Sequence, residues 1–215
     1  MKYIFLFYLP GAGGNFFSRC LNLLAGSHCW LNSISQTMPD DRLSLLSYRP
    51  VMYLTESQRN WIDWETAIQH YSKFQILPPD SASMSIWQDH PRYDLLEKNI
   101  AGIDDQQLVI YIDASDNFEW CLLNAIYKNS FFELGWLATA ERMRQDPDIF
   151  KVSLKNLVGS SETFLIELQR VCDYIGHTMS DQEQLAINTL YKEWKTTTLD
   201  PKNFAEFKRR IGFHL

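Results

Sequence analysis

Hydrophobic side chains near the start of the chain change their spacing abruptly at a cluster of glycines. Residues 3–9 form an unbroken apolar and aromatic run, which is typical of a strand buried on both faces of a parallel sheet. After the glycines, apolar residues recur at helical spacing, and Gly26 is placed to end that helix. The pattern therefore predicts a strand, a tight loop and a helix that begins near Asn15 or Phe16.

The same order of elements returns in the second half of the chain. Residues 108–112 are a second continuous apolar run, and Asp116 with Glu119 three positions later is the pattern of a capping box at a helix start. Residues 149–154 give a further short strand candidate.

Two helices are predicted after this last strand. The apolar positions of residues 164–175 line one helical face, and Gly176 is placed to end the helix. The next helix is expected to start at Ser180, with Glu183 completing a capping box, and to continue through Trp194.

The region between the first two strands has a weaker pattern. Residues 51–54 are a plausible short strand, and residues 56–74 carry a Trp-rich helical pattern. Strands that alternate with helices predict a three-layer α/β/α fold with a central, mostly parallel sheet. No repeat and no Gly-, Ser- or Pro-rich linker divides the sequence, so residues 1–215 are expected to form one domain.

The amino-acid composition argues against several classes of binding partner and of location. A formal net charge of −6 argues against nucleic acid or an anionic membrane as a general partner, because both require clustered cations. No stretch reaches the roughly 18 apolar residues of a membrane span, and the N-terminal apolar run is too short for a signal peptide. The four cysteines are scattered without a CxxC pair, which favours reduced thiols in the cytoplasm and no metal site.

The glycine cluster is the strongest candidate for chemistry. Glycines permit backbone angles that point successive amides into one concavity, and the positive end of the following helix adds to the attraction for phosphate or sulfate. A plain tight connection between strand and helix is the structural alternative. The spacing lacks the Lys of GxxxxGK[ST], which argues against an ordinary P-loop kinase or ATPase. The predicted anion-binding residues are Gly11, Ala12, Gly13, Gly14, Asn15 and Phe16.

Several landmarks occur in the order in which the sulfotransferase family has them, and the chain resembles that family over about residues 3 to 195. The stretch 10–15 occupies the place of the family's 5′-phosphosulfate loop, and residues 89–91 (Asp-His-Pro) are similar to its His-containing segment. Residues 109–112 and 152–157 resemble two of its later strands.

This resemblance implies a P-loop NTPase-like (sulfotransferase-like) fold and a reaction. The donor would be 3′-phosphoadenosine 5′-phosphosulfate, and the acceptor a hydroxyl of a carbohydrate or small metabolite. His90 would act as the base that takes the proton of the acceptor hydroxyl as its oxygen attacks sulfur.

Three positions depart from the family pattern. Gly11 stands where the loop has a basic residue, while Asp113 and Cys121 stand where an Arg and a Ser bind the 3′-phosphate of the cofactor. Arg19 on the loop helix, or Arg209 in a basic run near the C-terminus, is the candidate for the missing cation.

Two alternatives stay open beside the transferase. A catalytically silent P-loop relative, binding a nucleotide or a protein partner, is consistent with the loss of three cofactor-contacting residue types. A kinase-like phosphotransferase would need a Mg²⁺ site, for which Asp113 or Asp116 at a strand end is the candidate.

Overall fold

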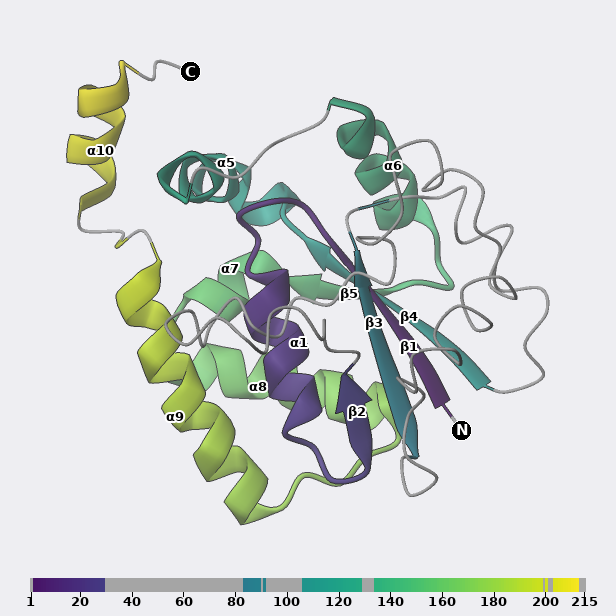
Figure 1. The fold of residues 1–215 in the computed structure, drawn as a ribbon. Coiled ribbons are helices and arrows are strands. Elements are labelled where there is room, and N and C mark those ends of the chain that lie inside the picture. Colours follow the sequence, from purple (N-terminus) through teal and green to yellow (C-terminus); the bar gives the residue numbers. More distant parts are fainter. Residues whose placement is uncertain are drawn as a thin grey trace, which may run out of the picture.

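Five strands and seven α-helices make up the part of the chain that the computed structural model describes (Figure 1). The described residues are 2–29, 83–89, 91, 106–128, 134–198, 200 and 203–212. The strands are β1 (Lys2–Tyr8), β2 (Ser27–Cys29), β3 (Met84–Asp89), β4 (Gln106–Asp113) and β5 (Phe150–Ser153). The helices are α1 (Gly14–Asn22), α5 (Phe118–Tyr127), α6 (Leu134–Gln145), α7 (Leu154–Val158), α8 (Ser161–Ile175), α9 (Asp181–Thr197) and α10 (Phe204–Ile211), with the 3₁₀ helix η3 at Ser115–Asn117.

The sheet is parallel throughout, in the order β2-β3-β1-β4-β5. The first strand of the chain is therefore its centre: Lys2 lies beside Met84 on one side and Gln106 on the other. Every side chain from Ile4 to Leu9 is buried, which confirms the expectation for the unbroken apolar run. The chain forms an α/β fold.

Helices lie on both faces of this sheet. Ile110 and Val152 are completely buried on the face that α8 covers, because Ile110 lies beside Phe150, whose ring stacks on Tyr174 of α8. Tyr111 alternates to the opposite face, where the charges of Arg144 and Glu141 on α6 act on it. Figure 1 shows α6 on the side of the sheet opposite to α8. The described residues thus form three layers, helices, sheet and helices.

The helix ends in the C-terminal half have local caps. Ser180 accepts a hydrogen bond from the Glu183 amide in a complete capping box, which confirms the predicted start of α9. Ser160 forms a second capping box with Thr163 at the start of α8, which was not predicted. Gly176 ends α8 in the left-handed conformation, as expected.

Two predicted helix ends are wrong. Gly26 does not end α1, which stops at Asn22 with Leu23 as its C-cap; Gly26 instead turns the chain into β2 with φ +75°. Asp116 does not start a capping box either, because α5 begins after Asn117 and Asp116 turns toward the start of α7. The sequence spacing of Asp116 and Glu119 does not show whether Asp116 caps the helix that follows it or binds the start of another helix that packs beside it.

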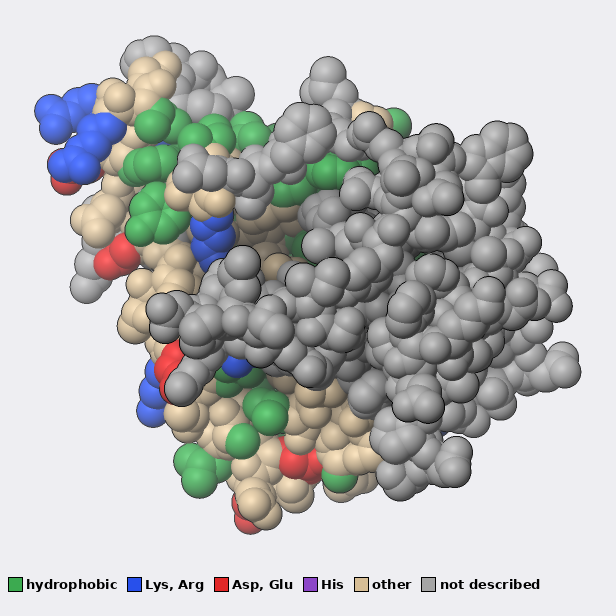
Figure 2. Space-filling model, in the orientation of Figure 1, with side chains coloured by type: hydrophobic (Ala, Val, Ile, Leu, Met, Phe, Trp, Pro, Cys, Tyr) green, Lys and Arg blue, Asp and Glu red, His purple; other side chains and the backbone are tan. Residues whose placement is uncertain are grey.

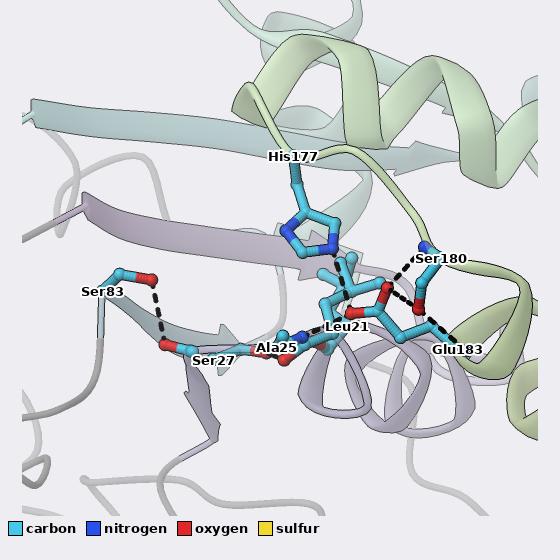
Figure 3. A network of polar contacts seen from close by, with 9 residues as sticks. Leu21, Ala25, Ser27, Ser83, His177, Ser180 and Glu183 are labelled. Carbon is cyan, nitrogen blue, oxygen red and sulfur yellow. Dashed lines mark hydrogen bonds and ion pairs between the residues drawn. The ribbon is translucent and has the colours of Figure 1, made fainter.

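Glu183 connects the α8–α9 turn to the far end of α1 (Figure 3). Its carboxylate accepts hydrogen bonds from the Ser180 amide and hydroxyl and from the Ala25 amide, and it lies 3.1 Å from His177 Nε2. Burial works against the charged form, but these hydrogen bonds outweigh it and lower the pKa of Glu183 to about 2.

Several elements of the structure were not predicted from the sequence, and two predicted elements lie outside the described residues. The strands β2 and β3 and the helices α6, α7 and α10 are findings of the structure. The predicted strand 51–54 and helix 56–74 lie outside the described residues. In the described part of the chain, none of the helices has both the length and the apolar character needed to cross a membrane.

Candidate anion-binding site

The glycine loop lies at the carboxyl end of the central strand, between β1 and α1. The chain passes from β1 to strands on one side of it and later to β4 and β5 on the other, so the strand order changes direction at β1. Crevices at the carboxyl ends of strands near such a point are where open α/β sheets bind ligands. Gly11 and Gly13 have φ of +85° and +78°, in the left-handed region that favours glycine.

Close packing against the chain itself accounts for three of the glycines. A Cβ on Gly11 would lie 2.1 Å from the carbonyl oxygen of Cys121, and one on Gly14 would lie 2.0 Å from the ring of Tyr8. A Cβ on Gly13 would lie 2.8 Å from the Trp194 ring. These positions therefore need glycine whether or not an anion binds, and the glycine cluster alone does not identify a phosphate site.

Some backbone amides of the glycine loop have hydrogen-bond partners among the described residues and others do not. Ala12 N–H donates to the Leu9 carbonyl at 3.0 Å, and Phe17 is the first residue to bond within the helix, to the Gly13 carbonyl. Five loop amides form no hydrogen bond among the described residues. They belong to Gly11, Gly13, Gly14, Asn15 and Phe16. At the positive end of a helix such amides are an anion-binding arrangement.

Side chains of the predicted loop residues serve the fold. The Tyr8 hydroxyl donates to Asn15 Oδ1 at 2.6 Å, which fixes the first turn of α1 to the end of β1. Phe16 is buried and stacks on Trp194 with ring centroids 4.1 Å apart. Phe164 and Tyr191 extend this cluster. Any contact of Phe16 with an anion would therefore come from its backbone, whereas Asn15 also has the Nδ2 donor of its side chain.

Helix α5 holds the other side of the loop. The Asn124 side-chain amide donates to the Gly11 carbonyl at 2.7 Å, and the Cys121 thiol to the Pro10 carbonyl at 3.1 Å. Both side chains are buried, and burial raises the pKa of Cys121 to about 12, so the thiol stays protonated.

The two candidate cations differ in position. Arg19 lies in the last turn of α1, one helical turn beyond Asn15, and is half-buried. Arg209 is exposed on α10, which is fastened to α5 by the Lys208–Glu119 ion pair. Figure 2 shows Lys and Arg side chains gathered at the outer end of α10. Among the described residues, no contact joins Arg209 to the loop.

The acidic residues at the neighbouring strand ends have partners of their own. Asp113 Oδ1 accepts from the Ser115 amide at 2.9 Å. Asp116 accepts from the Ser153 hydroxyl at 2.5 Å and from the Lys155 amide at 3.1 Å, so both of its oxygens bond to the start of α7. Within the described ranges, no three Asp, Glu, His or Cys side chains form a group able to hold a metal ion.

The remaining candidate lies outside the described residues. His90 is not described, although Pro91 after it is.

Sequence reasoning missed the residues that surround the loop. Asn124 has the clearest signal, as the one uncharged polar residue in the apolar stretch from Trp120 to Ile126. Tyr8 and Trp194 gave no such signal, because each belongs to an ordinary apolar pattern.

Comparison with models of known protein families gives no match, and comparison with curated proteins gives none either.

Proposed function

We propose that this chain is a sulfotransferase-like enzyme that moves a sulfuryl group from 3′-phosphoadenosine 5′-phosphosulfate to a hydroxyl of a carbohydrate or small metabolite. The proposal includes the finer fold assignment, a P-loop-like three-layer domain. One observation carries it: a loop whose amides include five without a hydrogen bond in the described part of the chain lies at the carboxyl end of the central parallel strand, at the start of α1. The buried free thiols Cys20, Cys121 and Cys172 favour a cytoplasmic location.

In this reaction the loop amides would hold the phosphosulfate oxygens. His90 would take the proton of the acceptor hydroxyl while its oxygen forms a bond to sulfur. The bond from sulfur to the bridging phosphate oxygen breaks, and 3′,5′-adenosine bisphosphate leaves with the electron pair. Charge that develops on the departing phosphate needs stabilisation, for which Arg19 and Arg209 remain the candidates.

A catalytically silent relative that binds a nucleotide is the second candidate. The observation that favours it is that two positions at which the chain departs from the family pattern, Cys121 and Asp113, make contacts within the fold itself. Cys121 is completely buried under the loop, and Asp113 binds the Ser115 amide. The kinase-like alternative is weaker, because Asp116 is already occupied by Ser153 and Lys155.

Calorimetry with 3′,5′-adenosine bisphosphate, beside ATP with and without Mg²⁺, tests the proposal. We expect the bisphosphate to bind without Mg²⁺, and more weakly at higher salt, because a few local charges hold it. Binding without transfer to any of a broad panel of hydroxylated acceptors would favour the silent relative. Binding of ATP only with Mg²⁺ would favour the phosphotransferase, and no binding of either nucleotide would overturn the nucleotide site.

The substitution Asn15→Asp locates the anion. Asp still accepts the Tyr8 hydrogen bond and is favourable in the first turn of a helix, so the fold should persist. Its charge should weaken bisphosphate binding at least about tenfold, or about 1.4 kcal/mol. Gln182→Asp is the matched control: it places the same charge at the second residue of α9, about 18 Å along that helix from Trp194. Equal affinity in both variants would exclude the loop as the binding site.

A further inference from the structure

Carbonyl direction decides whether a loop of this kind attracts or repels an anion. A trans peptide points its carbonyl oxygen and its N–H in opposite directions, and the described part of the chain contains only trans peptides. A loop that rotated one peptide plane would replace a donor by a carbonyl oxygen, which repels phosphate and sulfate. An anion site therefore needs something that holds the carbonyls away from it.

Two side chains of α5 hold the carbonyl oxygens of two successive loop peptides. Cys121 donates to the Pro10 carbonyl, so the Gly11 N–H points away from α5. Asn124 donates to the Gly11 carbonyl at 2.7 Å, and the N–H of that same peptide, from Ala12, bonds to Leu9. The two donors are three residues apart in α5 and so lie on one helical face.

The packing at this contact leaves little room for another arrangement. A Cβ on Gly11 would lie 2.7 Å from the Ala125 amide nitrogen, so the loop backbone is pressed against the backbone of α5. Asn124 is 1% exposed, and burying an amide is costly unless it is hydrogen-bonded. Turning the Gly11 carbonyl away would leave the buried Asn124 amide without this hydrogen bond, so the cost of that loss favours the observed orientation of the loop.

We propose that Asn124 and Cys121 are positioning residues of the anion site, which hold the Pro10 and Gly11 carbonyls on α5 so that neither oxygen faces a donor bound by the loop amides. This inference rests on the proposed function. It also gives a role to Cys121 at a position where the resembled family has a cofactor-binding Ser: here the thiol donates to the Pro10 carbonyl of the loop. Asn124 contributes a strong donor and Cys121 a weak one.

The test compares Asn124→Leu, which keeps the volume but cannot donate, with Asn188→Leu, which makes the same replacement on α9 and removes the hydrogen bond that Asn188 accepts from the Ser161 hydroxyl. Two readouts are measured on the full chain: the backbone amide NMR signals of Gly11 and Gly13 without ligand, and the affinity for 3′,5′-adenosine bisphosphate. We expect Asn124→Leu to shift both glycine signals and to weaken binding by about tenfold or more, and Asn188→Leu to change neither.

A second pair of variants covers the case in which Asn124→Leu does not fold. Cys121→Ala should weaken binding, and Cys121→Ser, which restores a donor to Pro10, should recover it. Unchanged glycine signals and affinity in folded Asn124→Leu, or equal affinity of the two Cys121 variants, would overturn the inference. Absence of bisphosphate binding in the unaltered chain would refute the proposed function, while the glycine signals would still show whether Asn124 orients the loop.

Discussion

At the scale of single residues, the loop shows how one position meets opposing demands. Gly14 is the first residue of α1 and does not have a positive φ, so helix propensity alone favours Ala there by about 0.5–1 kcal/mol. The Tyr8 ring occupies the place of a Cβ, at 2.0 Å. Steric overlap at this distance requires the ring or the helix to move, and it outweighs propensity.

Gly14→Ala should therefore destabilise the protein by about 1–3 kcal/mol, the usual cost of overpacking. Gly135→Ala is the matched control on α6, because a Cβ there meets nothing within 4 Å. It should stabilise by about 0.5–1 kcal/mol. Urea denaturation of both variants measures the difference, and a stabilising Gly14→Ala would contradict the packing of α1 on Tyr8.

At the scale of elements, the two ends of α1 are held by different chemistry. The loop end packs on aromatic rings, whereas the other end is fastened through Glu183 to the turn between α8 and α9. One carboxylate thus satisfies the Ala25 amide and the Ser180 amide, which belong to segments far apart in the chain (Figure 3).

This fastening gives an expected pH dependence. Folding lowers the pKa of Glu183 from its usual 4.5 to about 2, so its contribution to stability is present above pH 4.5 and is lost as the pH falls toward 2. Glu183→Gln should cost about 1–3 kcal/mol at neutral pH, and the deficit should shrink below pH 4.5. Glu193→Gln, at an exposed site on the same helix, should change stability by less than about 0.5 kcal/mol. Chemical denaturation from pH 7 to pH 3 measures this, and a constant deficit would contradict it.

The elements also show what a sequence pattern can predict. The strands at 3–9 and 108–112 were predictable because both of their faces are buried, and α8 and α9 because their caps are local. The contacts of Asp116 with α7 and of Asn124 with the loop were not, since each joins segments that only the fold brings together. The loop's position followed from its neighbours in sequence, whereas the side chains that orient it did not.

At the scale of the whole molecule, α10 differs from the other helices in its burial. None of its residues is buried, whereas α8 and α9 contain completely buried side chains such as Phe164 and Ile187. It lies beside α5 (Figure 1), which it contacts through the Phe207–Tyr127 ring pair and the Lys208–Glu119 ion pair. An exposed ion pair contributes at most about 1 kcal/mol.

Hydrogen exchange should therefore separate α10 from the rest of the described fold. We expect the amides of residues 204–211 to exchange well before those of 161–175, because a helix with few buried contacts opens locally without global unfolding. Mass spectrometry of peptic fragments measures both segments in one experiment. Equal protection of the two would show that α10 unfolds only together with the sheet.

The central place of β1 also has a consequence during synthesis. This strand is synthesised well before its two neighbours in the sheet, which begin at Met84 and Gln106. At about 5–20 residues per second, β1 waits on the order of 5–20 s for the second of them. For that time a continuous run of Ile, Phe and Leu has no sheet to join. Nascent chains of this protein are therefore expected to bind chaperones at residues 4–9, and slower translation between β1 and β4 should increase aggregation.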